Sequence, residues 1–259
     1  MNFQTLLFRQ TSKPISPIDS RARIRKDVFL SHVYKSLLEK MLIAADLTPS
    51  KIQGKLLIEI GSAGGITKSL YPVISTLDVR SDVEVDHVVS TTQLPFGDET
   101  IDVVIGKDVF HHIPDVQAHL YEVSRVLKGG GYCVYLEPNW NWFSRFFYTF
   151  VHPEPWDSRQ REWHFTSDNP MFSNQALPWI VFVRDLDLLT ARFPEFEYQI
   201  EESPLLGLSY LISGGVNRRN FINGELLKKL YRTEQSKLRY LKHFGLSRLI
   251  VLKKRQIPQ

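Results

Sequence analysis

The sequence predicts an α/β protein built on a doubly wound parallel β-sheet. Short apolar runs alternate with amphipathic segments between residues 51 and 138, which is the order of repeated strand–helix–strand units. One of these runs ends in an acidic residue and a glycine-rich turn at 59–65, followed by a segment that can begin a helix. Sheets of this kind bind ligands at the carboxyl ends of their strands, so we expect the functional residues at that edge.

Length and composition fit one globular domain with an elaborated cap. The chain has 259 residues, of which 43% are hydrophobic and 23% charged. Cys133 is the only cysteine, which excludes an internal disulfide and a cysteine-based zinc site and fits a reducing compartment. The first 20 residues lack the pattern of a signal peptide, and no run reaches the roughly 18 apolar residues of a membrane span. We therefore expect a cytoplasmic protein without a metal site.

The charge is distributed unevenly along the chain. Residues 1–60 carry 10 Lys and Arg against 5 Asp and Glu, a net +5, whereas residues 61–204 carry 10 against 21, a net −11. Residues 205–259 carry 12 against 2, a net +10. A basic end behind an acidic middle suggests an anionic partner such as a lipid surface, a phosphate-bearing substrate or nucleic acid. A solvated helix face explains the same charges equally well.

Apolar periodicity places the elements of the first half. It predicts a helix over 27–46 and a second over 114–128, which the glycine run at 129–131 ends. A further helical pattern starts at Ile66 and breaks at Pro72. The predicted strands are 55–60, 75–79, 87–90, 101–106 and 131–138.

The second half is less regular. Residues 139–156 are rich in aromatic side chains, and 179–193 has the pattern of a helix. Two strand-like segments, 197–203 and 248–254, flank a basic helical segment at 225–244.

The turn that follows Glu59 predicts a nucleotide-type cofactor site. Glycine there permits a positive φ and a close approach of the backbone to a ligand. Asp78 stands 19 residues after Glu59, at the end of the next predicted strand, where a carboxylate can accept hydrogen bonds from both hydroxyls of a ribose. A nicotinamide-dependent oxidoreductase is the competing interpretation, but it requires G-x-G-x-x-G, and residues 61–66 read GSAGGI.

Four segments in order resemble one family over about residues 54–138. IEIGSAGG, TLDVR, QLPFGDETIDVVIGKDVFHHIPD and EVSRVLKGGGYCVYLEP are similar to the type 11 family of class I methyltransferases. The resemblance implies S-adenosylmethionine as cofactor and a Rossmann-like sheet, mostly parallel with an antiparallel final strand, that carries helical and aromatic cap insertions. It divides the chain into an N-terminal helical segment (1–50), a cofactor-binding core (51–138), and an acceptor-covering insertion with the C-terminal completion of the same domain (139–259).

The resemblance also assigns cofactor contacts to the glycine turn and to the ends of the next three strands. The residues concerned are Glu59, Gly61, Ser62, Gly65, Asp78, Val79, Ser90, Thr91, Leu94 and Lys107. Two positions depart from the family pattern. Ala63 replaces the usual middle glycine, and Ser90 with Thr91 stands where the family commonly has an acid that contacts the adenine amine. Recognition of adenine is therefore expected to use backbone atoms and a hydroxyl.

Three residues are candidate proton acceptors for methyl transfer. His111 and His112 follow the fourth predicted strand, and Glu137 ends the fifth, so all three fall at the ligand-binding edge. A hydroxyl acceptor needs a base, whereas an ionised acceptor needs only alignment. The alternative is structural: the histidines can cap the following helix, and Glu137 can simply end its strand.

The segment 139–172 predicts the type of acceptor. Eight of its aromatic residues form a dense group that suits a sugar face, an isoprenoid or a flat ring, and it can equally dock on an anionic membrane or fill a core. EPNW, HPEPWD and SNQALP also resemble methyltransferases encoded with bacterial surface-polysaccharide enzymes. We therefore expect an O or N acceptor that is a small molecule or is linked to a glycan or lipid. A non-catalytic scaffold is the alternative, and a nucleic-acid acceptor is disfavoured because no N/D-P-P-Y/F motif is present.

Overall fold

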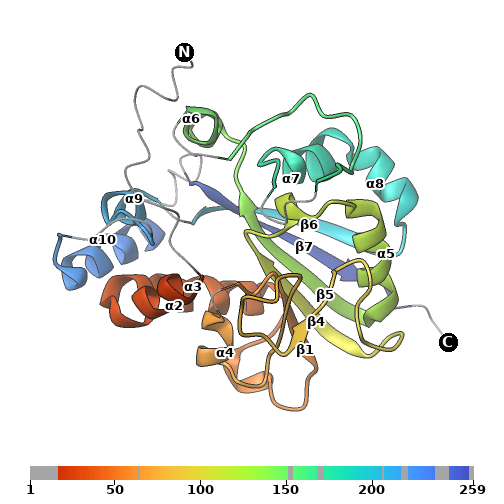
Figure 1. Ribbon diagram of the computed structural model, residues 1–259, viewed down its shortest axis with the longest axis horizontal. Helices are drawn as coiled ribbons and strands as arrows, with labels where there is room; N and C mark the ends of the chain where they lie inside the picture. Colours follow the sequence, from red (N-terminus) through yellow and green to blue (C-terminus); the bar gives the residue numbers. More distant parts are fainter. Residues whose placement is uncertain are drawn as a thin grey trace.

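A seven-stranded sheet forms the centre of the molecule (Figure 1). The computed structural model describes residues 17–63, 65–150, 154–167, 172–205, 207–216, 221–236 and 245–256. The strands lie in the order β3-β2-β1-β4-β5-β7-β6. Their bounds are β1 (Leu57–Ile60), β2 (Ser75–Asp78), β3 (His87–Val88), β4 (Ile101–Lys107), β5 (Leu127–Pro138), β6 (Phe196–Leu205) and β7 (Ser247–Lys254).

The strand directions confirm the predicted fold class. β1 pairs in parallel with β2 and β4, and β4 pairs in parallel with β5. The last strand, β7, lies antiparallel between β5 and β6. The parallel strands β1 to β5 therefore end at one edge, where the predicted functional residues meet.

Helices cover both faces of the sheet (Figure 1). The helices are α2 (Pro17–Lys26), α3 (Val28–Ala44), α4 (Ile66–Leu70), α5 (Val116–Val126), α6 (Trp142–Phe150), α7 (Leu177–Trp179), α8 (Leu186–Arg192), α9 (Leu208–Ile212) and α10 (Gly224–Ser236). Short turns are 3₁₀-helical at η1 (Pro49–Lys51) and η2 (Phe110–His112) and π-helical at η3 (Ile180–Arg184).

Strand periodicity divides the core in two. Ile58 and Tyr135 point to the face covered by α5, α7, η3 and α8, while Leu57 and Val134 point to the face covered by α3 and α10. This alternation follows from the two-residue repeat of a strand, and apolar residues on both sides are typical of a parallel sheet buried between helix layers.

Two aspartates begin the main helices. The Asp27 carboxylate accepts hydrogen bonds from the backbone N–H of Phe29 (2.9 Å) and Leu30 (3.0 Å) at the start of α3. The Asp115 carboxylate accepts one from Ala118 (2.9 Å) at the start of α5. Each aspartate satisfies a backbone donor that has no partner within its helix, so both helices start where the sequence predicts.

Two elements differ from their predictions. The helix expected over 179–193 is divided into α7, η3 and α8 by the π-helical turn. The glycine run at 129–131 lies inside β5 and does not end the helix; at Gly131 a Cβ would come within 3.0 Å of the Asp102 carbonyl oxygen, so glycine fits there. Strand and helix therefore meet directly at Leu127. Residues 237–244 of the predicted basic helix lie outside the described residues.

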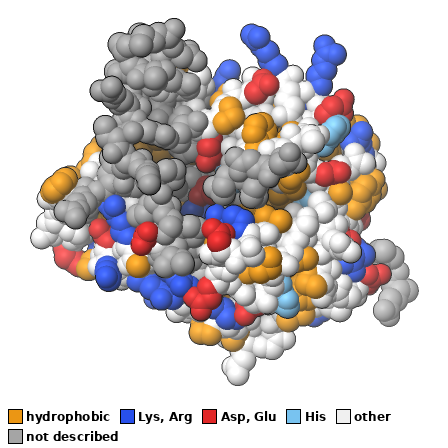
Figure 2. Space-filling model, viewed as in Figure 1, with side chains coloured by type: hydrophobic (Ala, Val, Ile, Leu, Met, Phe, Trp, Pro, Cys, Tyr) orange, Lys and Arg blue, Asp and Glu red, His pale blue; other side chains and the backbone are white. Residues whose placement is uncertain are grey.

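The described surface shows no separation of charge on the face drawn in Figure 2, where the described Lys and Arg side chains lie among Asp and Glu. In the described part of the chain, no helix combines the length and apolar character needed to cross a membrane.

Candidate functional site

The turn after β1, residues 59–65, is shaped by its backbone, and we call it the cofactor turn. Gly61 has φ +62° and Gly65 has φ +58°, in the left-handed region that favours glycine. A Cβ at Gly61 would lie 2.2 Å from Cγ2 of Val109, so the residues after β4 pack directly on this glycine. The N–H of Ser62 donates to the Leu77 carbonyl at 3.0 Å and ties the turn to β2.

Glu59 stabilises the cofactor turn from inside. Its carboxylate is buried and accepts hydrogen bonds from the hydroxyls of Ser62 and Thr67, the latter at 2.7 Å. Burial raises the pKa of Glu59, against the effect of these two hydrogen bonds. Both carboxylate oxygens contact the turn or α4, so the geometry supports a positioning role.

Asp78 connects the end of β2 to the cofactor turn. Its carboxylate accepts hydrogen bonds from the N–H of Ala63 (2.9 Å) and from the N–H (3.0 Å) and Nε (3.3 Å) of Arg80. Val79, the next residue, is 56% exposed. A buried carboxylate and an exposed apolar side chain therefore follow one another beside the turn.

The segment after β3 lies at the same edge. The N–H of Val89 donates to the Asp78 carbonyl at 2.8 Å, which places Ser90 next to the end of β2. Ser90 is exposed, and its hydroxyl lies 2.8 Å from that of Thr92. Leu94 is buried, and its N–H donates to Glu122 at 2.8 Å. Ser90 thus lies at this edge with an exposed hydroxyl, whereas Leu94 is part of the core and is hydrogen-bonded to α5.

Lys107 ends β4 and turns toward the N-terminal helices. Its ammonium forms an ion pair with Asp108 and lies 4.9 Å from the ring centroid of Tyr34. Burial alone lowers the pKa of Lys107, but the adjacent Asp108 carboxylate outweighs burial and holds the pKa above its ordinary value. Asp108 and Tyr34 therefore hold the Lys107 ammonium at the carboxyl end of β4.

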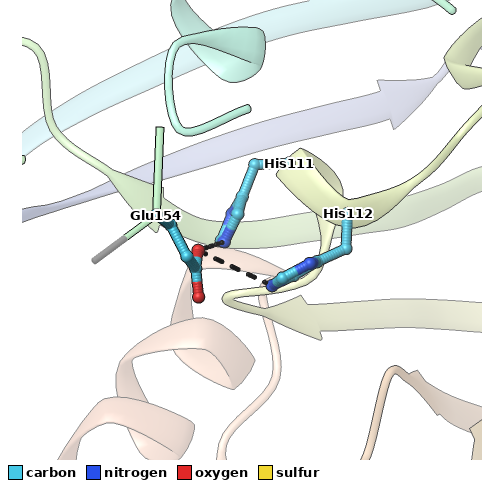
Figure 3. Close-up of side chains that lie close together, drawn as sticks. All are labelled: His111, His112 and Glu154. Carbon is cyan, nitrogen blue, oxygen red and sulfur yellow. Dashed lines mark ion pairs between the residues drawn. The ribbon is translucent and has the colours of Figure 1, made fainter. Parts of the chain in front are cut away.

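His111, His112, Glu137 and Glu154 form what we call the histidine cluster (Figure 3). Nδ1 of His111 lies 2.6 Å from the Glu137 carboxylate, whose other oxygen accepts hydrogen bonds from the N–H of Val109 (2.9 Å) and Phe110 (2.8 Å). Glu137 is fully buried. Its three partners give it the geometry of a residue that positions His111.

Glu154 faces both histidines from the segment after α6. Nε2 of His111 lies 3.5 Å and Nε2 of His112 lies 3.9 Å from the same Glu154 oxygen. Glu154 also accepts hydrogen bonds from the Ser173 hydroxyl (3.0 Å) and the Gln175 amide. In the sequence, Glu154 was one of several polar residues in the aromatic segment, and no spacing signal linked it to the histidines.

The two imidazoles of the cluster differ in their electrostatics. Burial lowers the pKa of His111, but the Glu137 and Glu154 carboxylates outweigh it and raise the pKa to about 10. The pKa of His112 is lowered by burial and by the neighbouring His111. The ligand-free cluster therefore holds a proton on His111 before His112.

A second buried histidine was not anticipated. His119 lies on α5, with Nε2 2.6 Å from the Tyr135 hydroxyl and Nδ1 3.2 Å from the Thr91 carbonyl oxygen. Burial lowers its pKa to about 4, so the imidazole is neutral at physiological pH. A neutral ring with its N–H at Nδ1 satisfies both contacts.

Comparisons with known proteins agree with this geometry. Residues 72–135 match the family model for a methyltransferase domain. Phthiotriol/phenolphthiotriol dimycocerosates methyltransferase 1 of Mycobacterium ulcerans is 32% identical over 108 residues, which are 35% of this chain and 40% of that protein. The corresponding Mycobacterium tuberculosis methyltransferase is 32% identical over 120 residues, 36% of this chain and 42% of that protein. These matches span well under two thirds of the curated relatives.

A solved structure of geranyl diphosphate C-methyltransferase from Streptomyces coelicolor is 11% identical, with a TM-score of 0.49, and covers 99% of this chain and 99% of that chain. The family model and the curated relatives show that this chain carries a methyltransferase domain that uses S-adenosylmethionine, and the sheet topology and the cofactor turn agree with that assignment.

Proposed function

We propose that this protein transfers a methyl group from S-adenosylmethionine to an oxygen or nitrogen atom of a small-molecule, glycan-linked or lipid-linked acceptor. The observation that carries the proposal is the meeting of the cofactor turn and the histidine cluster at one edge of the sheet. Val109 joins them, because it packs on Gly61 and donates its N–H to Glu137.

The residues at the ends of β1, β2 and β3 fit the cofactor. A side chain at Gly61 would collide with Val109, so only glycine fits where the turn packs on the residues after β4. Asp78 offers a carboxylate for a ribose diol, Val79 an apolar surface for a base, and Ser90 an exposed hydroxyl. When bound, S-adenosylmethionine supplies an electrophilic methyl group on a positively charged sulfur.

The histidine cluster fits the acceptor side of the reaction. Glu137 holds Nδ1 of His111, and the Phe172 carbonyl oxygen lies 3.1 Å from Nδ1 of His112. Both rings therefore direct Nε2 away from these anchors and toward Glu154 (Figure 3). We propose that the reacting acceptor atom lies on this Nε2 side, where the cluster orients the acceptor and removes its proton if it is a hydroxyl.

Helix α6 supports a hydrophobic portion of the acceptor. Trp142, Phe146 and Phe150 are spaced four residues apart and are 65%, 58% and 48% exposed. The inner side of α6 reaches the cluster region, because Tyr148 stacks on Trp156 with ring centroids 6.2 Å apart. An apolar strip beside a polar centre suits an acceptor with a hydroxylated or amino head and an apolar tail. The curated relatives are named for phthiotriol and phenolphthiotriol dimycocerosates.

Calorimetric titration with S-adenosylmethionine tests the cofactor half of the proposal. The wild-type protein is expected to bind saturably, and Asp78→Asn to bind about tenfold more weakly, because a charged hydrogen bond to the ribose is lost. Asn keeps an acceptor for the Ala63 N–H, and Asp82→Ala, an exposed acid nearby, is the control that leaves affinity unchanged.

Two outcomes would overturn the proposal. Folded wild-type protein that does not bind S-adenosylmethionine would leave the scaffold interpretation, and binding of NADH in its place would point to an oxidoreductase. If the cofactor binds, methyl transfer from labelled S-adenosylmethionine to hydroxylated lipids, glycolipids and sugars identifies the acceptor class.

A further inference from the structure

We propose that the histidine cluster is a binding site for a divalent transition-metal ion, with His111, His112 and Glu154 as its protein ligands. Each residue offers one ligand atom, a ring nitrogen or a carboxylate oxygen, and these three atoms lie within 4.8 Å of one another. Ligands bonded to one ion at about 2.0–2.2 Å are about 3.0–3.6 Å apart, so the 3.5 Å and 3.9 Å separations need only a small closure.

The contacts behind the histidines are those of metal ligands. A ligating histidine donates its other ring N–H to a carboxylate or a backbone carbonyl, which fixes the ring and its tautomer. His111 has the buried carboxylate of Glu137 at Nδ1, and His112 has the carbonyl oxygen of Phe172 at Nδ1. Both Nε2 atoms are thereby directed to one point from independent anchors.

Glu154 is held in the same manner. The Ser173 hydroxyl and the Gln175 amide nitrogen donate to its carboxylate, as expected for a ligating carboxylate. Gln175 is 2% exposed, and among the described residues its amide oxygen has no hydrogen-bond partner. This oxygen belongs to the amide that contacts Glu154, so a buried polar atom without a hydrogen-bond partner lies beside one of the three proposed ligands.

Charge and ligand type indicate the class of ion. Glu137 and Glu154 bring two carboxylates to the cluster, and a divalent cation balances both. Two imidazoles with one carboxylate suit zinc, manganese, iron or cobalt, whereas magnesium and calcium prefer oxygen ligands. The sequence predicts no metal site. The single cysteine, however, excludes only cysteine-based sites and leaves a site of histidine and glutamate open.

The site gives the proposed methyl transfer a specific form. Three protein ligands leave at least one coordination position of the ion open. With the ion bound, both Nε2 atoms would be ligands, so an acceptor hydroxyl at the open position would lose its proton to water in place of a histidine, and its oxygen would form the new bond to the methyl carbon as the bond from that carbon to sulfur breaks. This role rests on the proposed function, but the metal site itself does not.

Metal binding is tested without cofactor or acceptor. Wild-type protein is treated with a chelator, dialysed, and titrated with Zn²⁺, with Mg²⁺ as the competing ion. We expect about one zinc per chain, retained in excess Mg²⁺. His112→Gln and Glu154→Gln are expected to weaken zinc binding by at least about tenfold. Cobalt is the second probe, and its visible absorption bands should disappear in both variants.

A matched control separates this site from general histidine affinity. His164 is exposed on the segment beside α5, and His164→Gln should bind zinc as the wild type does. Circular dichroism confirms that each variant is folded. The inference is overturned if wild-type protein takes up no stoichiometric zinc, or if both cluster variants bind it as tightly as the wild type. Because neither readout involves S-adenosylmethionine, failure here is distinct from failure of the proposed methyl transfer.

Discussion

The cofactor turn and the histidine cluster are neighbours that depend on different parts of the chain. The cofactor turn owes its shape to the backbone angles at Gly61 and Gly65 and to hydrogen bonds accepted by the carboxylates of Glu59 and Asp78. The histidine cluster is made of side chains, and Glu154 reaches it from a distant segment. We therefore expect the turn to be sensitive to added volume and the cluster to altered charge and hydrogen bonding.

The largest effect is expected from adding one methyl group to the turn. In Gly61→Ala the new Cβ would lie 2.2 Å from Val109 and would require φ +62°. Overpacking and left-handed strain together should lower the free energy of unfolding by about 2–4 kcal/mol. Urea unfolding measures this loss, and calorimetry should show that cofactor binding is lost with it.

Gly54→Ala is the matched control for strain without collision. Gly54 has φ +80°, and a Cβ there would meet no atom within 4 Å. Its cost should be about 1 kcal/mol, the strain contribution alone. Equal losses at Gly61 and Gly54 would show that packing on Val109 does not hold the turn.

A change of charge should affect the cluster and spare the turn. In Glu137→Gln the amide keeps one oxygen acceptor for the N–H groups of Val109 and Phe110 but presents its NH₂ to His111 Nδ1. Replacing this buried charged hydrogen bond by an amide NH₂ that faces the His111 ring should lower the free energy of unfolding by about 2 kcal/mol. Affinity for S-adenosylmethionine should stay within about twofold, because the amide oxygen still accepts the Val109 N–H through which Glu137 is linked to the cofactor turn.

Glu99→Gln is a control for removal of a glutamate charge at the surface. Glu99 pairs with Lys254 at 2.9 Å and its side chain is 59% exposed, so its loss should cost less than about 1 kcal/mol. A tenfold loss of cofactor affinity in Glu137→Gln would contradict the separation of the two regions.

Stability should fall in acid because of His119. Its pKa in the folded protein is about 4, below the value of about 6.5 in an unfolded chain, so the unfolded state binds more protons between these values. The stabilisation is complete above about pH 6.5 and is lost as pH falls toward 4, by about 2 kcal/mol at pH 5. Tyr135 and Thr91 contact the ring, and the nearby Glu122 opposes the shift.

Urea unfolding at pH 7 and pH 5 measures this contribution. His119→Gln should be less stable than wild type at pH 7 and should lose about 2 kcal/mol less between the two pH values. An unchanged slope in the variant would assign the acid sensitivity to other groups.

The contrast between the two regions also explains what could be predicted from the sequence. The strand ends and Asp78 were found because short apolar runs and a glycine turn depend on residues close in sequence. The partner of the histidines was not, because the contact of Glu154 with His111 depends on how an irregular segment folds back over β4 and β5. The π-helical turn at Ile180–Arg184 has the same apolar periodicity as an α-helix, so packing, and not pattern, distinguishes it.

The smallest change in stability, with a clear functional effect, is expected on α6. Phe146→Ser removes a side chain that is 58% exposed, so unfolding should change by less than about 0.5 kcal/mol. If α6 receives an apolar tail or lipid surface, the Phe146 ring becomes buried on binding. Its loss should then weaken binding to phosphatidylglycerol-containing vesicles by about tenfold, measured by flotation. Leu226→Ser, on α10 and 60% exposed, is the control that should leave binding unchanged.

Two outcomes would remove the lipid-linked acceptor from the proposal: wild-type protein that does not bind such vesicles, or equal losses of binding in both variants. The small-molecule and glycan classes would remain, since their recognition depends on the polar cluster and not on the outer face of α6.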